Sequence, residues 1–81
     1  MGKIFEIIQV SLQDLAENFH TLMVSGGAKY FTINCFGDVK FWYIGDVRED
    51  GTYPCYPTDD EGNVQPPRIV NLDQKVRIYY N

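Results

Sequence analysis

Residues 11–27 read SLQDLAENFHTLMVSGG, and this stretch carries the one complete helical signature in the chain. Ser11 is a good N-cap, and Asp14 three residues later can complete a capping box. The two glycines at the end of the stretch can close the final helical turn. Apolar residues recur at offsets of three and four, which places them on one stripe of a helix. These residues are Leu12, Leu15, Ala16, Phe19, Leu22 and Met23. The pattern predicts a helix over residues 12–24.

The segments on either side of this helix have the composition of β-strands. Residues 3–10 are apolar on both faces, which favours a central strand. Residues 29–36 and 39–44 alternate between apolar and polar side chains, and Gly37-Asp38 between them predicts a β-hairpin with a short turn. Residues 75–80 alternate again and predict a terminal strand.

Residues 45–67 contain most of the turn-forming residues of the chain. We therefore expect a long surface loop, with room for one further short strand near residues 52–56. The element order is then β-α-β-β-loop-β. The fold class that follows is α+β, with one amphipathic helix packed on one face of a mainly antiparallel sheet of about four strands.

Length and composition limit what the chain can be. At 81 residues there is room for a single domain over residues 1–81. The 44% hydrophobic and 15% aromatic content is too high for a disordered protein. No apolar run is long enough to span a bilayer, and the N-terminus lacks the order of a signal peptide, so we expect a cytoplasmic protein without a membrane partner.

The net charge of -4 is set by eleven acidic residues against seven basic ones. A chain with this charge is repelled by phosphate backbones, which disfavours direct nucleic-acid binding. Without a secretory signal, the two cysteines are expected to be free thiols. Cys35 is in phase with Phe31 and Ile33, which predicts a buried side chain, whereas the position of Cys55 between two prolines stays open.

The candidate binding surface is the sheet face that the helix does not cover. If the helix covers Phe31, Ile33, Val39, Phe41, Val76 and Ile78, the opposite face presents Tyr30, Thr32, Lys40, Trp42, Arg77 and Tyr79. Aromatic and basic residues of this kind are frequent hot spots of protein interfaces. They also form the stacking platforms of single-stranded nucleic-acid binders. A third interpretation is that they only fill cross-strand pairs on a half-exposed sheet.

A second candidate region is the acidic run Asp59, Asp60 and Glu61. An acidic surface can imitate nucleic-acid phosphate and occupy a basic groove on another protein. It can equally be a solvated loop that keeps the chain soluble. A calcium loop of the EF-hand type is excluded, because the register around Gly62 places Pro57 where the first aspartate belongs.

No recognised catalytic, metal or cofactor motif is found in the sequence. His20 is the one histidine, and neither cysteine belongs to a pair with metal-ligand spacing. There is no nucleophile elbow and no glycine-rich phosphate loop before the helix. We therefore expect neither catalysis nor a metal or cofactor, although a small enzyme with a site in residues 45–67 remains an alternative.

These observations favour a small acidic, non-catalytic protein-binding module. Within that class we expect an inhibitor or regulator that occludes a basic, nucleic-acid-handling partner protein. Two alternatives stay open: a single-stranded nucleic-acid binder that uses the aromatic and basic sheet face, and a minor structural subunit of an assembly. A homodimer through an exposed edge strand is compatible with each of them.

Overall fold

The computed structural model describes residues 7–80, and it begins with a strand that runs directly into a helix. Strand β1 (Ile7–Ser11) is followed by helix α1 (Leu12–Glu17). The Ser11 hydroxyl accepts a hydrogen bond of 3.1 Å from the backbone amide of Asp14. This bond satisfies one of the amides that the first turn of a helix leaves without a partner. The predicted N-cap is confirmed, and residues 3–6 of the first predicted strand lie outside the described residues.

The predicted helix over residues 12–24 is present as two segments with different geometry. Helix α1 ends at Glu17, and Asn18 leaves the helical conformation with φ of -125°. A π-helical segment, η1 (His20–Ser25), follows it. The side-chain amide of Asn18 donates to the carbonyl oxygen of Asp14, which also accepts from the Asn18 backbone amide. Asparagine competes in this way with the regular helical ladder, which explains a break that the apolar periodicity does not reveal.

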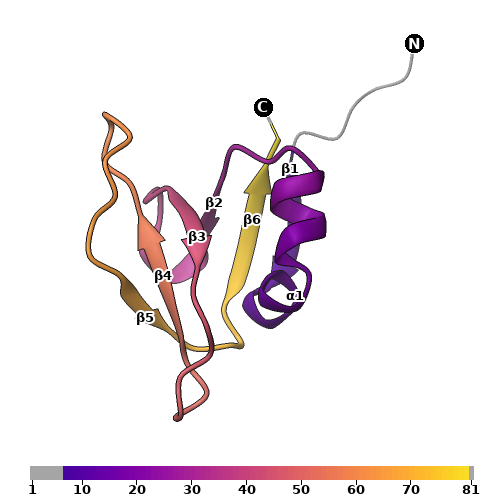
Figure 1. Ribbon diagram of the computed structural model, residues 1–81, viewed down its shortest axis with the longest axis vertical. Helices are drawn as coiled ribbons and strands as arrows, with labels where there is room; N and C mark the ends of the chain where they lie inside the picture. Colours follow the sequence, from indigo (N-terminus) through magenta and orange to yellow (C-terminus); the bar gives the residue numbers. More distant parts are fainter. Residues whose placement is uncertain (1–6, 81) are drawn as a thin grey trace.

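The remaining strands complete a six-stranded antiparallel sheet (Figure 1). They are β2 (Tyr30–Ile33), β3 (Phe41–Ile44), β4 (Tyr53–Pro57), β5 (Arg68–Val70) and β6 (Lys75–Tyr79). Their order in the sheet is β1-β6-β2-β3-β4-β5, so the last strand lies between β1 and β2. The α+β class is confirmed, but the sheet has more strands than the four expected. Strand β1 is also an edge strand rather than a central one, because β6 is its one partner in the sheet order.

The connection between β2 and β3 is wider than the predicted turn. Strand β2 ends at Ile33 and is followed by a 3-10 segment, η2 (Asn34–Phe36). The two strands pair in antiparallel fashion only at Phe31 and Phe41. Gly37 has φ of 64°, which suits glycine, but it closes η2 rather than a two-residue hairpin turn. The strand pairing was thus predicted and the turn was wrong.

Residues 45–67 are more ordered than the predicted surface loop. Strand β4 occupies the place where one further short strand was expected. Residues 58 and 64 then form a bridge at the base of a second hairpin turn. Strand β5 was not predicted, because it has only three residues and directly follows Pro66 and Pro67, which normally indicate a loop.

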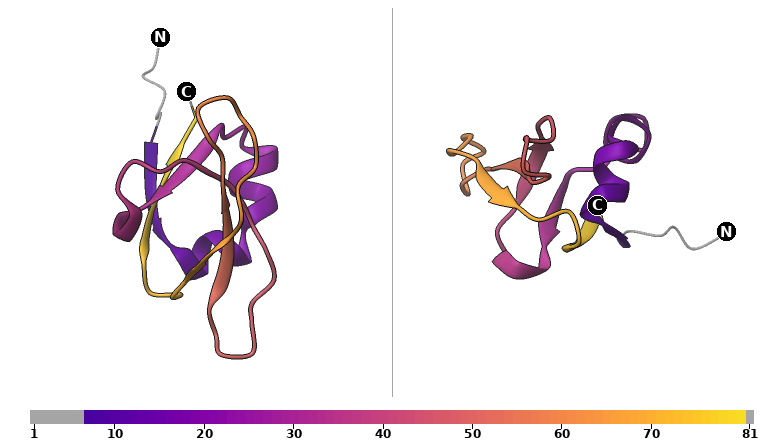
Figure 2. Two further views of the ribbon diagram at one scale, coloured as in Figure 1. Left: turned by 90° about the vertical axis from the view of Figure 1, so that its left-hand side faces the viewer. Right: turned by 90° about the horizontal axis from the view of Figure 1, so that it is seen from below.

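The sheet is strongly bent, and the helix lies inside the bend. Figure 2 shows β4 and β5 on one side of the fold and β1 with α1 on the other. Residues 71–74 join β5, at one edge, to β6, near the opposite edge. This connection also binds the start of the helix, because the Leu12 amide donates to the Gln74 carbonyl oxygen at 2.8 Å and the Gln13 amide donates to that of Leu72 at 3.2 Å.

The core fills the space between the helix and the concave face of the sheet. Its buried residues are Leu12, Leu15, Met23, Phe31, Ile33, Phe41, Ile44, Cys55, Val70, Val76 and Ile78. The helix therefore covers the predicted apolar face, in which Val39 alone is half-buried. The rings of Phe31 and Phe41 stack at 5.7 Å across the bend and join the two halves of the sheet.

Truncation of Leu15, which is fully buried on α1, tests this packing. We expect Leu15→Ala to lower the free energy of unfolding by about 3 kcal/mol, because it removes apolar contacts and leaves a cavity. Gln13→Ala on the exposed side of the same helix is the control and should change it by less than about 0.5 kcal/mol. Urea unfolding curves measure both, and equal effects would contradict the assigned helix face.

The two cysteines are free, as predicted, but their environments differ from the expectation. Cys35 is exposed because η2 interrupts the alternation that would have placed it beside Ile33. Cys55 is the buried one, with 0% exposure on β4. Burial, together with a smaller effect of the charge of Cys35, raises the pKa of the Cys55 thiol to about 12.

A thiol reagent should therefore modify Cys35 in the native protein and leave Cys55 intact. The reactive species is the thiolate, which Cys55 does not form near neutral pH. Titration with a chromogenic disulfide should release one equivalent under native conditions and two after unfolding in urea. Cys35→Ser should abolish the native reaction, and a native reaction that survives this change would show that the assignment is wrong.

Candidate functional site

The convex face of β1, β6 and β2 carries side chains in a regular array. Gln9 on β1 is paired with Arg77 on β6, and Arg77 is paired with Thr32 on β2. The row towards one end of the strands contains Ile7, Tyr79 and Tyr30, and the row towards the other contains Ser11, Lys75 and Asn34. Alternate residues such as Val76 and Ile78 point into the core. We call this convex surface the Arg77 face.

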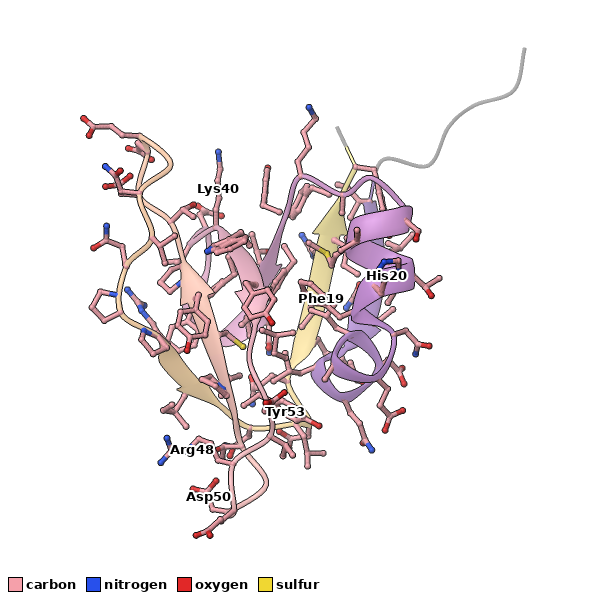
Figure 3. The ribbon with its side chains drawn as sticks, in the orientation of Figure 1. Phe19, His20, Lys40, Arg48, Asp50 and Tyr53 are labelled. Carbon is pink, nitrogen blue, oxygen red and sulfur yellow. The ribbon has the colours of Figure 1, made fainter. Side chains whose placement is uncertain are left out.

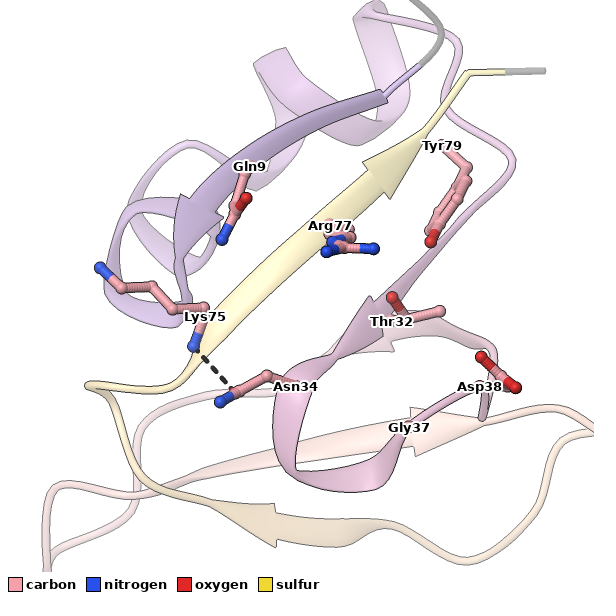
Figure 4. A pocket seen from close by; sticks show the side chains of 8 residues that line it. All are labelled: Gln9, Thr32, Asn34, Gly37, Asp38, Lys75, Arg77 and Tyr79. Carbon is pink, nitrogen blue, oxygen red and sulfur yellow. Dashed lines mark hydrogen bonds between the residues drawn. The ribbon is translucent and has the colours of Figure 1, made fainter.

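A hollow of about 300 Å³ lies on the Arg77 face. Its lining consists of Gln9, Thr32, Asn34, Gly37, Asp38, Lys75, Arg77 and Tyr79. Figure 4 shows the Arg77 guanidinium at the centre of this set. The one hydrogen bond drawn among these residues joins the backbone amide of Lys75 to Oδ1 of Asn34 at 3.1 Å. The charged ends of Lys75 and Arg77 are thus free of hydrogen bonds to the other residues of the lining.

Two tyrosines and a lysine form the end of the Arg77 face. The rings of Tyr30 and Tyr79 stack with centroids 4.6 Å apart. The Lys40 Nζ lies 4.9 Å from the centroid of the Tyr30 ring, within cation-π range. The structure thus brings together five of the six predicted sheet-face residues, namely Tyr30, Thr32, Lys40, Arg77 and Tyr79.

Trp42 does not belong to the Arg77 face, which corrects the predicted set of six. The register between β3 and β4 shifts between Phe41 and Tyr43, as at a β-bulge. Phe41 and Ile44 are both buried although they are three residues apart, so simple alternation fails in β3. An extra residue of this kind changes the direction of the side chains that follow it. Trp42 therefore lies beside Tyr43, Val24 and Lys29, near the end of η1.

The bulge creates an exposed aromatic surface between β3, β4 and the helix, and Figure 3 labels Phe19 on the helical side of it. Tyr43 is at its centre, with ring centroids 5.3 Å from Phe19, 5.4 Å from Trp42 and 6.0 Å from Tyr56. We call these four residues the Tyr43 cluster. Trp42 is 45% exposed and Tyr43 is 43% exposed, and the exposed side chains of Val24 and Val47 extend the apolar surface.

The Tyr43 cluster was not predicted, because strict alternation over residues 39–44 puts Tyr43 and Trp42 on opposite faces and the periodicity of the helix puts Phe19 on its apolar stripe. The available signal was the run of four large apolar residues at 41–44, which no strict alternation can bury on one face. Phe19 is half-buried at the edge of the helical stripe, so it contributes to the core and to the surface together.

Acidic residues border the Tyr43 cluster on one side. Glu17 and Asp46 line a shallow hollow together with Phe19 and Tyr43. The hairpin turn that follows adds Glu49 and Asp50 next to Val47. Two cations are also near, Lys29 beside Trp42 and Arg48 in the turn. Four carboxylates against two cations leave this border negative.

The predicted acidic run lies in a different turn, and its members have different roles. Oδ1 of Asp59 accepts hydrogen bonds from the backbone amides of Glu61 at 2.9 Å and Asn63 at 2.8 Å. The carboxylate of Asp59 thus holds the turn together, while Asp60 and Glu61 are exposed. Figure 1 shows this turn and the turn at residues 48–51 at opposite ends of the long axis, with β4 between them.

Acidification should expose the structural role of Asp59. Hydrogen bonds from backbone amides, that of Asn63 above all, lower the pKa of Asp59 below its ordinary value of 3.8. Well above pH 3.8 the carboxylate is ionised in both states and its stabilisation is complete. Below 3.8 the unfolded chain takes up the proton first, so stability falls until the folded-state pKa is passed.

The measurement is the free energy of unfolding against pH for Asp59→Asn and for Asp60→Asn. Asparagine keeps an acceptor oxygen but does not titrate, so the fall below pH 3.8 should be shallower in Asp59→Asn. Asp60→Asn should follow the unchanged protein. Parallel curves for all three proteins would contradict the assigned hydrogen bonds.

Side chains arranged for metal binding or catalysis are few in residues 7–80. Within residues 7–80, no cluster of three or more His, Cys, Asp and Glu side chains could hold a metal ion. His20 Nδ1 and Ser25 Oγ are 3.1 Å apart, and both side chains are exposed on η1. None of the helices in residues 7–80 has the length and apolar character needed to cross a membrane.

Comparisons with models of protein families, with curated proteins and with solved structures found no match for this chain. The Arg77 face and the Tyr43 cluster are therefore the two candidate sites.

Proposed function

We propose that the protein is a non-catalytic binding module that docks on a basic partner protein through the Tyr43 cluster. The observation that supports this proposal is the aromatic surface that the exposed rings of Trp42 and Tyr43 form with the half-buried rings of Phe19 and Tyr56. Exposed Trp and Tyr side chains in contact with one another are the residue types on which binding energy concentrates in protein interfaces. Their large area is inexpensive to order on binding, because each ring has only two side-chain torsions.

The charges around the cluster indicate the chemistry of the partner. Glu17, Asp46, Glu49 and Asp50 give the border a negative potential, in a chain with a net charge of -4. A partner of complementary character would offer an apolar pocket or side chain surrounded by Lys and Arg. Such a surface is common on proteins that handle nucleic acid, so occupation by this module would compete with the nucleic acid and act as inhibition or regulation.

The same geometry weakens the alternative of a single-stranded nucleic-acid binder. That alternative needs Tyr30, Trp42 and Tyr79 side by side as stacking platforms. The bulge in β3 removes Trp42 from the Arg77 face. The ring of Tyr30 is already in contact with the ring of Tyr79 and with Lys40.

The test is capture of partners from a nuclease-treated lysate by tagged protein, followed by affinity measurement on the captured protein. We expect one protein with a basic surface to be retained. Trp42→Ala should weaken its binding about 30-fold, as is typical of an interface hot spot. Retention should also decrease between about 0.1 and about 0.5 M salt, because the acidic border contributes by attraction through solvent.

Ile69→Ala on β5 is the matched control, because Ile69 is 46% exposed but lies outside the Tyr43 cluster. It should leave the binding unchanged. Capture that Trp42→Ala does not affect, or that nuclease abolishes, would contradict the proposal. Retention of a second copy of this chain alone would identify the cluster as a homodimer interface instead.

A further inference from the structure

The Arg77 face is separate from the Tyr43 cluster and has the opposite electrostatic character. Three of the seven Lys and Arg residues of this acidic chain lie on it, namely Lys40, Lys75 and Arg77. Arg77 is central, since its pairing partners Gln9 and Thr32 flank it across the sheet. Lys75 and Tyr79 lie on either side of it along β6, each about 7 Å away by strand geometry.

The hollow above Arg77 has the size of a small-molecule site, and its lining is mainly polar. Its volume of about 300 Å³ is at the lower end of the range for such sites, roughly 300–1,000 Å³. Figure 4 shows the hydroxyl end of Tyr79 directed towards Arg77 and Thr32. The hollow thus combines two cations with several neutral hydrogen-bonding groups.

The side chains of the hollow determine which ligand chemistry fits. A guanidinium donates paired hydrogen bonds that match a phosphate or a carboxylate, and a neighbouring ammonium adds charge. The amides of Gln9 and Asn34 and the hydroxyl of Thr32 can each donate or accept, as hydroxyl groups of a ligand require. Asp38, on the rim, accepts hydrogen bonds only and repels a second anion.

We propose that this hollow binds a sugar monophosphate, with the phosphate on Arg77 and the sugar hydroxyls on Asp38 and Thr32. A phosphate alone would leave Thr32 and Asp38 without a function, and a neutral sugar would leave Arg77 without one. A nucleobase is disfavoured because the Tyr30 ring is engaged with Tyr79 and Lys40.

The experiment follows the backbone amide resonances of ¹⁵N-labelled protein during titration with ribose 5-phosphate. At concentrations up to about 10 mM, a ligand with a Kd of about 1 mM nearly saturates its site. We expect shifts at Gln9, Thr32, Asp38 and Arg77, with ribose giving none and inorganic phosphate binding at least about fivefold more weakly.

Arg77→Gln should weaken ribose 5-phosphate binding at least about tenfold, because it removes the central charged donor. Arg48→Gln makes the same change of charge in the hairpin turn at residues 48–51, outside the hollow, and should leave the affinity within about twofold. Both residues are exposed, so neither change should disturb the fold, and an unaltered amide spectrum without ligand verifies this.

Asp38→Asn separates the two parts of the proposed site. Removal of the carboxylate should strengthen binding of inorganic phosphate, because a like charge is lost, and should reduce the preference for ribose 5-phosphate over phosphate. A preference unchanged by Asp38→Asn would overturn the assignment of the sugar to this side of the hollow.

Three other results would overturn the proposal. One is the absence of any shift on the Arg77 face at the highest concentration. Another is equal affinity for inorganic phosphate and ribose 5-phosphate, which would leave a simple anion site. The third is tighter binding of a mixed single-stranded oligonucleotide that Arg77→Gln abolishes, which would assign the face to nucleic acid.

Discussion

The pairing of β6 with both β1 and β2 is the constraint on which the rest of the structure depends. These backbone ladders connect the N-terminal strand, the strand after the helix and the last strand into one antiparallel unit. Since β5 must reach β6 through residues 71–74, the sheet has to bend, and the bend forms the concave face that the helix fills. The same register aligns Gln9, Arg77 and Thr32 on the convex face, so the core and the polar hollow have a common origin.

The elements that the sequence predicts are those marked by a pattern within a few neighbouring residues. The helix stripe, its N-cap at Ser11 and the alternation of Val76 and Ile78 are short-range patterns, and each is present in the structure. The order of the strands was not predictable. Backbone hydrogen bonds between distant strands do not depend on side chains, so the residues of a strand do not indicate which other strand it pairs with. The short strand β5 was not predicted because the two prolines before it indicate a loop. The break at Asn18 was not predicted because the apolar periodicity indicates a continuous helix.

The candidate surfaces were predicted only where they depend on local alternation within a strand. Tyr30, Thr32, Arg77 and Tyr79 lie together because β2 and β6 keep strict alternation and happen to be neighbours. Trp42 does not join them, since one extra residue in β3 changes the direction of its side chain. The Tyr43 cluster combines residues of the helix, β3 and β4, so it exists only in the folded chain. The role of Asp59 could not be predicted from composition. The sequence indicates a surface charge, whereas in the structure its carboxylate accepts hydrogen bonds within a turn.

The central position of β6 also has a consequence for biosynthesis. A ribosome makes β1 and β2 before residues 75–79, so until then these two strands lack the strand that lies between them in the folded sheet. Their backbone groups stay without the partner strand until synthesis has passed Tyr79. A fold dominated by such long-range pairing is also expected to form slowly. Until β6 has been made, the nascent chain therefore has exposed strand edges, and it is at this stage that protection by a chaperone would matter most.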